Sequence, residues 1–119
     1  MTAEIKLDLS YLDSIAGGDQ SFIKEMMEMF LRSTPAEMVR IEDYFKSGDL
    51  TMMSSAAHKI KAPVQMLGEK RTADLVLEIE RIGKQQTDTE KLPGLVDELR
   101  NRLTKLYEVV QQHINGLQL

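Results

Sequence analysis

The sequence contains no cysteine and no tryptophan, and it has only three prolines and seven glycines among 119 residues. Without cysteine the chain forms no disulfide, binds no metal through thiolates and performs no cysteine catalysis. It lacks a run of about 18 consecutive apolar residues, the length that a membrane-spanning helix needs. Residues 1–20 also lack the basic start and apolar run of a signal peptide. We therefore expect a cytoplasmic protein without membrane insertion.

The residues that are abundant favour helices. Leu, Met, Ala, Glu, Lys and Arg dominate, and all are good helix formers. Apolar residues make up 42% and charged residues 29%, which is ordinary for a globular protein. The net charge of -4 does not suggest the basic surface of a nucleic-acid binder, so we expect no nucleic-acid partner. The length predicts one domain over residues 1–119, with an ordered core over about residues 8–114.

The first half of the chain predicts a short helix and a long one. The short helix covers residues 8–16 and stops at two glycines, after which Asp19 is a suitable N-cap for the next helix. Apolar positions then recur every three or four residues, as on one side of a helix. These positions are Ile23, Met27, Phe30, Thr34, Met38, Ile41 and Phe45. Pro35 is expected to kink this helix without ending it, because the pattern continues beyond it.

Three further helices complete the prediction. Asp49 is expected to cap the third helix, which ends at Gly68. The fourth helix covers residues 69–84, and residues 85–91 form a loop. Pro93 is expected in the first turn of the last helix. The inward positions are Met53, Ala56 or Ala57, Ile60, Val64, Leu67, Leu75, Ile79, Ile82, Val96, Leu99, Leu103, Leu106 and Val110. The expected fold is all-α, an antiparallel four-helix bundle with a short N-terminal helix capping one end.

One histidine stands among small and basic residues in AAHKIKAPVQMLG, residues 56–68. Successive helical residues turn by about 100°, so His58 lies about 200° from the inward Ile60 and is expected to be exposed. Lys61 follows three residues later on the same surface. Neutral imidazole is a nucleophile for phosphoryl groups, and an ammonium offsets their charge, so the pair fits phosphoryl transfer. A solvated histidine beside an unrelated lysine is the alternative.

The same segment resembles the signature of the histidine-containing phosphotransfer (Hpt) domain family, which runs roughly A-H-x-L-K-G-x-x-x-x-L-G. The residues that match it in identity or kind are Ala57, His58, Ile60, Lys61, Leu67 and Gly68. Residues 17–38 resemble the family's Gly-Asp turn and long helix with its proline, and residues 45–50 resemble the turn before the histidine helix. The resemblance covers about residues 8–114.

The resemblance implies a protein that carries phosphoryl groups between aspartates of response-regulator receiver domains in a two-component phosphorelay. It assigns His58 as the phosphoacceptor and Lys61 as the cation that stabilises the phosphate. Such a protein has no ATP-dependent kinase activity and needs no cofactor or metal of its own, because Mg²⁺ belongs to the receiver. The implied partners are receiver domains or a hybrid histidine kinase, and this chain is expected to be a monomer.

The resemblance also implies a receiver-docking surface beside the histidine. The residues assigned to it are Ile15, Phe22, Met26, Ala62, Gln65 and Lys84. Phe22 and Met26 form a stripe with Met29 that fits a wide core face equally well. Lys84 also fits an exposed ion pair with Glu80, which lies one turn earlier on the same helix.

Two residues depart from the family pattern. Ala62 replaces a glycine and adds a methyl group where the receiver approaches, and Pro63 cannot donate a hydrogen bond to the carbonyl of Lys59. We expect transfer to survive both changes. With Pro63, residues 58–64 (HKIKAPV) also match the phosphoacceptor box of dimerising sensor histidine kinases, apart from Lys59. That kinase hairpin, and a helical adaptor that binds receivers without transferring phosphate, are the alternative interpretations.

Overall fold

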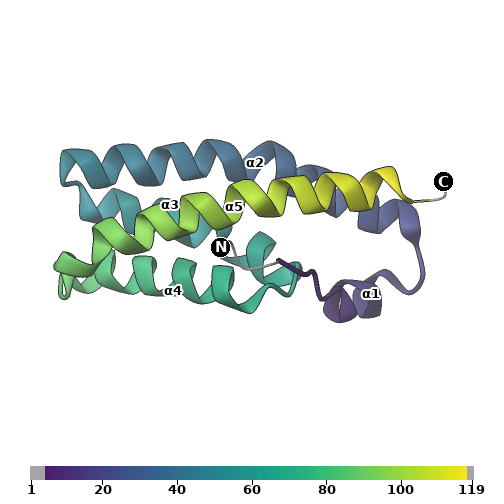
Figure 1. Ribbon diagram of the computed structural model, residues 1–119. Helices are drawn as coiled ribbons and strands as arrows, with labels where there is room; N and C mark the ends of the chain where they lie inside the picture. Colours follow the sequence, from purple (N-terminus) through teal and green to yellow (C-terminus); the bar gives the residue numbers. More distant parts are fainter. Residues whose placement is uncertain (1–4, 118–119) are drawn as a thin grey trace.

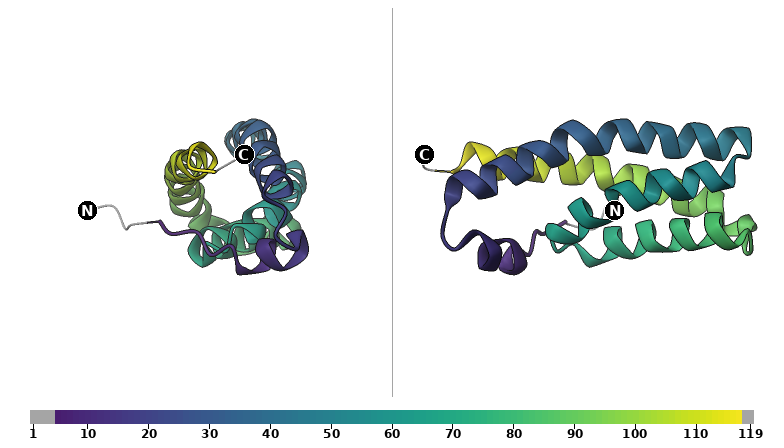
Figure 2. Two further views of the ribbon diagram at one scale, coloured as in Figure 1. Left: turned by 90° about the vertical axis from the view of Figure 1, so that its right-hand side faces the viewer. Right: turned by 180° about the vertical axis from the view of Figure 1, so that it is seen from behind.

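The computed structural model describes residues 5–117, so the outermost residues of the expected domain 1–119 lie outside it. The elements are α1 (Ser10–Ala16), α2 (Gln20–Ser47), α3 (Leu50–Met66), α4 (Lys70–Gln85), the 3-10 turn η1 (Thr89–Lys91) and α5 (Leu92–Asn115). The four long helices run antiparallel in chain order (Figure 1) and surround a common core when viewed from one end (Figure 2). The predicted all-α bundle is therefore confirmed. Among the described residues, no helix has the length and apolar character that crossing a membrane requires.

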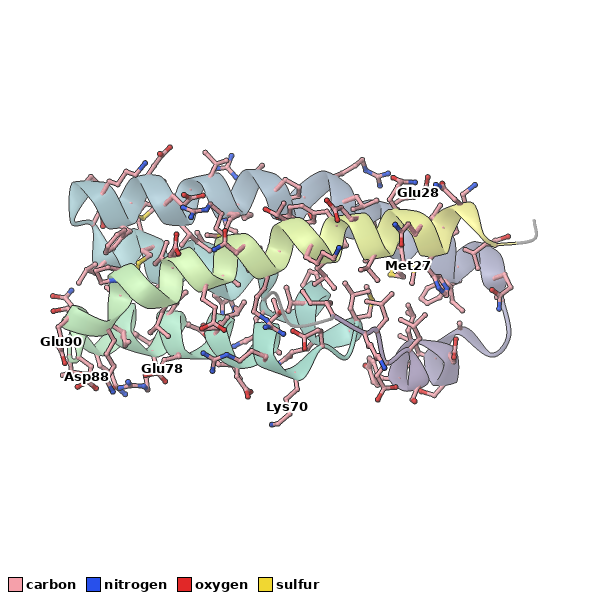
Figure 3. All side chains as sticks on the ribbon, viewed as in Figure 1. Met27, Glu28, Lys70, Glu78, Asp88 and Glu90 are labelled. Atoms are coloured by element: carbon pink, nitrogen blue, oxygen red, sulfur yellow. The ribbon has the colours of Figure 1, made fainter. Side chains whose placement is uncertain are left out.

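The core consists of the side chains that the three- and four-residue spacing placed inward. Every predicted inward position is buried except Phe45, which is half-buried, and both Ala56 and Ala57 are inside. Figure 3 shows the contrast between Met27, which is turned into the bundle, and Lys70, which extends away from it. Helical periodicity alone thus identified the packed faces, because each helix buries one stripe against its neighbours.

The helix ends follow local chemistry. The Asp19 carboxylate accepts hydrogen bonds from the backbone N–H groups of Ser21 and Phe22, and Asp49 accepts one from Met52, so both predicted N-caps are confirmed. Helix α2 continues through Pro35, as expected. The expected loop over residues 85–91 was too long, because α4 extends to Gln85 and η1 forms a turn just before α5.

The N-terminal segment closes one end of the bundle. Helix α1 lies at the end where α3 stops and α4 begins (Figure 1), and its Leu12 is fully buried. The backbone N–H of Asp8 donates to the carbonyl of Leu67 at 3.0 Å. Gly68 has φ +73°, and a Cβ there would lie 2.2 Å from the Asp8 carbonyl oxygen. Only glycine fits both the left-handed backbone and this close approach, which explains the Leu-Gly pair in the sequence motif.

Candidate functional site

The imidazole of His58 projects from the middle of α3 into solvent. Its side chain is 64% exposed, as the helical angle from Ile60 predicted. The ring is nevertheless held in place, because its Nδ1 lies 2.6 Å from Oε2 of Glu80 on the neighbouring helix α4. One nitrogen of the ring is therefore engaged inside the protein, while the rest of the ring is open to a partner.

Glu80 is the centre of this arrangement. Its side chain is only 11% exposed, and Oε1 accepts a hydrogen bond from Nζ of Lys61 at 3.2 Å, while Oε2 contacts His58. Burial by itself would raise the pKa of the Glu80 carboxyl, but the hydrogen bonds to His58 and Lys61 outweigh burial and lower this pKa. At neutral pH the group is therefore a carboxylate shared by a histidine and a lysine.

The close approach of α3 and α4 brings these side chains together. A Cβ at Gly83 would lie 2.7 Å from the carbonyl oxygen of Leu50, so glycine allows the two helices to touch. One turn away, the buried hydroxyl of Ser54 donates to the carbonyl of Glu80 at 2.9 Å. These contacts fix the register of α4 against α3, and with it the position of Glu80 beneath the His58 ring.

The carboxylate determines which ring nitrogen carries the proton. An ionised carboxylate only accepts hydrogen bonds, so Nδ1 of His58 must be the donor to Glu80. In a neutral imidazole the lone pair then resides on Nε2, which points away from this contact. In the neutral ring, the contact with Glu80 therefore sets the tautomer and leaves Nε2 as the nucleophilic nitrogen.

A polar groove of about 400 Å³ opens beside the histidine, lined by residues of α3 and α4. Two lysines, Lys59 and Lys84, contribute to its walls. Neither lysine makes an ion pair within residues 5–117. The alternative of an exposed Glu80–Lys84 pair is wrong, because Glu80 is buried and pairs with His58 and Lys61 of α3 instead. Lys84 and His58 line the same groove, and a docking role for Lys84 stays a prediction.

An apolar groove of about 300 Å³ lies next to the site, between α1, α2 and α3. Its apolar lining includes Ile15, Met26, Met29, Ala62, Pro63 and Met66. We call this surface the apolar groove. It unites three of the predicted docking residues, and Gln65 lines a smaller depression that shares Ala62 and Met66 with it. Phe22 does not line this groove. It is half-buried and packs against the core.

Comparisons with known proteins identify the family. A sequence model of the Hpt domain matches residues 25–112, which is more than half of the chain. The chain belongs to the Hpt domain family. This match favours the Hpt interpretation over the kinase hairpin, as does a four-helix bundle that one chain completes.

Two solved structures share the fold of this Hpt domain. The Hpt domain of a sensor hybrid histidine kinase from Shewanella has a TM-score of 0.82 at 29% identity, covering 95% of this chain and 97% of that one. Histidine-containing phosphotransfer protein B from Pseudomonas aeruginosa PAO1 has a TM-score of 0.84 at 15% identity, covering 98% and 100%. A search of curated proteins gave no significant match.

The function of this chain follows from its membership of the Hpt family. The protein performs histidine phosphotransfer in two-component phosphorelay signalling, and it partners the receiver domains and kinases of such a relay. Within residues 5–117, no group of three or more His, Asp or Glu side chains is arranged to hold a metal ion.

The two departures from the family pattern both lie in the wall of the apolar groove. Ala62 is exposed one turn after His58, so its methyl group stands at the surface of the groove. Pro63 is half-buried in the same wall, and α3 nevertheless continues to Met66. The helix therefore accommodates the lost hydrogen bond without ending.

Glu80 is the site residue whose role the sequence did not reveal. It was recognised only as a partner of Lys84, because a sequence shows neighbours on one helix and not contacts between residues 22 positions apart. A signal was present, since Glu80 follows the inward Ile79 and so borders the packed face of α4. An acidic residue at the edge of a core face requires a partner from the adjacent helix.

Proposed function

We propose that His58 accepts the phosphoryl group through Nε2 and passes it on to the aspartate of a second receiver domain. One observation carries this proposal: the ring is 64% exposed while its Nδ1 is held at 2.6 Å by a carboxylate. A merely solvated histidine would have no such buried partner. The arrangement leaves one nitrogen available for chemistry and, in the neutral ring, makes Nδ1 the protonated nitrogen.

The proposed transfer is a balanced exchange. The Nε2 lone pair of His58 attacks the phosphorus of an aspartyl phosphate, an N–P bond forms, and the P–O bond to the aspartate breaks, so that the aspartate leaves as a carboxylate. The imidazole becomes a cation that keeps its proton on Nδ1. The Glu80 carboxylate stabilises this cation. In the reverse step the ring leaves as neutral imidazole, because it has kept the Nδ1 proton, and neutral imidazole is a better leaving group than imidazolate.

We assign Lys61 to stabilising the phosphoryl oxygens and Lys84 to contacting the partner. Lys61 is 30% exposed and shares Glu80 with His58, so its ammonium lies one turn from the reacting nitrogen. Lys84 lines the groove beside the ring. Mg²⁺ is expected in the receiver's acidic pocket, and no cofactor is proposed for this chain.

The decisive test is phosphorylation of this protein by a phosphorylated receiver. Wild type is expected to acquire acid-labile, alkali-stable phosphate, and His58→Gln is expected to acquire none. His113→Gln is the matched control, because it removes the other histidine of the chain and should leave phosphate uptake intact. Uptake by His58→Gln would refute the assignment, and a wild type that binds the receiver without uptake would indicate the non-catalytic adaptor.

The apolar groove is the proposed docking site for the receiver. It is continuous with His58 through Ala62, and its half-buried Met26 lies on α2 facing that wall. Met26→Asp is expected to reduce transfer roughly tenfold without loss of helicity, since an unpaired charge would be buried on docking. Val39→Asp is the control, because Val39 is an exposed apolar residue of α2 outside the groove. Equal loss in both variants would contradict docking here.

We propose that the protein acts as a cytoplasmic monomer. One chain supplies all four helices around the core, so no second copy is needed to bury it. A kinase hairpin would require two chains. Sedimentation equilibrium is expected to give the monomer mass of 13.5 kDa. A stable dimer would contradict the proposal.

A further inference from the structure

Methionines are distributed unevenly over the molecule. Three of those in the described residues, Met27, Met38 and Met53, are buried in the core. Three others, Met26, Met29 and Met66, line the apolar groove. Met52, 43% exposed near the start of α3, is the remaining accessible one within residues 5–117. The thioethers that a solvent-borne reagent can reach are therefore concentrated on the proposed docking surface.

We propose that the apolar groove is an oxidation-sensitive modification site, at which peroxide converts Met26, Met29 and Met66 to sulfoxides and thereby prevents receiver docking. This inference rests on the proposed function of the groove. It adds a chemical condition under which the relay is interrupted. A methionine sulfoxide reductase with a thiol reductant would restore docking, so the interruption is reversible.

The modification is a two-electron oxidation with peroxide as the co-reactant. The sulfur lone pair attacks one peroxide oxygen, an S–O bond forms and the O–O bond breaks. The other oxygen leaves as hydroxide and takes the proton of the S–OH group, which gives the sulfoxide and one water molecule. Sulfur is oxidised and peroxide is reduced by the same two electrons, and no metal is required.

Oxidation is expected to disrupt docking at the apolar groove, because the groove binds its partner mainly through apolar contacts. Apart from its apolar walls, the groove lining offers the hydroxyls of Tyr11 and Ser33, and Oγ of Ser33 already donates to the carbonyl of Met29 at 2.8 Å. Three sulfoxide oxygens would therefore lack sufficient hydrogen-bond donors once a partner excludes water. Methionine suits such a surface because its flexible side chain adapts to several partners. The same residue type exposes the surface to oxidation, whereas the buried methionines of the core are shielded.

The test compares each protein with itself before and after oxidation. The protein alone is treated with hydrogen peroxide, quenched with free methionine and mixed with an untreated phosphorylated receiver. Mass spectrometry reports which methionines carry oxygen, and circular dichroism reports the fold. Wild type oxidised at the groove methionines is expected to keep its helicity and to lose transfer roughly tenfold. Subsequent reduction of the sulfoxides should restore the rate.

Two variants make the test specific. A protein with Met26, Met29 and Met66 all changed to Leu should retain its own starting rate after peroxide treatment, because leucine is apolar and does not react. Met52→Leu should lose transfer as wild type does, because Met52 lies about 15 Å along α3 from Ala62. If instead the triple variant is inactivated by peroxide and Met52→Leu is protected, the inference is overturned.

A substitution provides a second measurement that needs no oxidant. Met29→Gln places a polar group of similar length at a position that is 46% exposed, so it is compatible with folding. It is expected to weaken receiver transfer, while Met52→Gln leaves transfer unchanged. Wild type could instead transfer equally well before treatment and with all three groove methionines oxidised. That result would overturn this inference and leave the proposed function intact.

Discussion

Glu80 on α4 and Glu69 at the N-cap of that helix are both carboxylates near a helix interface, but they have different roles. Glu80 and Glu69 have side chains that are 11% and 12% exposed, respectively. In both, burial would raise the pKa of the carboxyl, and hydrogen bonds from neighbouring groups lower it instead. Each carboxylate thus stays ionised near a helix interface because adjacent donors compensate for the lost water.

The partners distinguish the two sites. Glu69 caps α4 by accepting from the backbone N–H and hydroxyl of Thr72, and it accepts from Arg102 of α5 at 2.6 Å. Arg102 is only 17% exposed and has no second reactive atom to offer, so this cluster holds α4 and α5 together. His58, the partner of Glu80, presents its other nitrogen to solvent. A buried carboxylate thus serves structure or chemistry according to whether its partner has a free reactive atom.

The largest expected effect is on stability, at Glu69. Glu69→Ala removes the N-cap of α4 and leaves the Arg102 guanidinium half-enclosed without its carboxylate. We expect the free energy of unfolding to fall by about 3 kcal/mol. Urea denaturation monitored by circular dichroism measures this loss. Glu98→Ala is the control, because Glu98 pairs with Arg71 at the surface and should cost less than about 1 kcal/mol. Equal losses in both variants would show that burial adds nothing at Glu69.

The sequence predicted the exposed His58, but it predicted the partners of neither glutamate. The helices, the caps at Asp19 and Asp49 and the buried stripes were predictable, because they depend on residues three or four positions apart. Glu69 was not recognised as a cap, since glutamate is uncommon at that position and its role depends on Arg102, 33 residues away. His58 was predictable as an exposed residue, but its contact with Glu80 depends on the register of two helices.

The next effect is on the chemistry, at Glu80. Glu80→Gln keeps the shape of the side chain and an oxygen for Nδ1 of His58, but it removes the charge that stabilises the imidazole cation. We expect phosphoryl transfer to slow about tenfold, which corresponds to about 1.4 kcal/mol of activation free energy. Stability at neutral pH should fall modestly, because the hydrogen bonds that lower the pKa of the Glu80 carboxyl outweigh the cost of burying its charge.

The matched control for this measurement is Glu69→Gln. It changes the same residue type at the N-cap of the same helix, away from the reacting nitrogen. Its transfer rate should equal that of wild type at a temperature where both proteins are folded. Radiolabelled transfer from a phosphorylated receiver gives both rates. A larger loss of transfer in Glu69→Gln than in Glu80→Gln would reverse the comparison between the two glutamates.

The smallest effect distinguishes the two glutamates least, and it tests what they share. Because the pKa of each carboxyl is lower in the folded protein than its ordinary value of 4.5, the unfolded chain binds more protons as the pH falls through and below that value. The stability that each ionised carboxylate contributes is therefore fully present above about pH 4.5 and is lost as the pH falls through the folded pKa.

Glu69→Gln and Glu80→Gln should each show a shallower acid decline in unfolding free energy than wild type, measured by urea titration between pH 3 and 6. The decline should persist in part, since the pKa values of Asp8, Glu78 and Glu98 are also lowered. An unchanged slope in either variant would mean that its carboxylate is not stabilised by folding, and the shared electrostatic design would then hold at only one of the two sites.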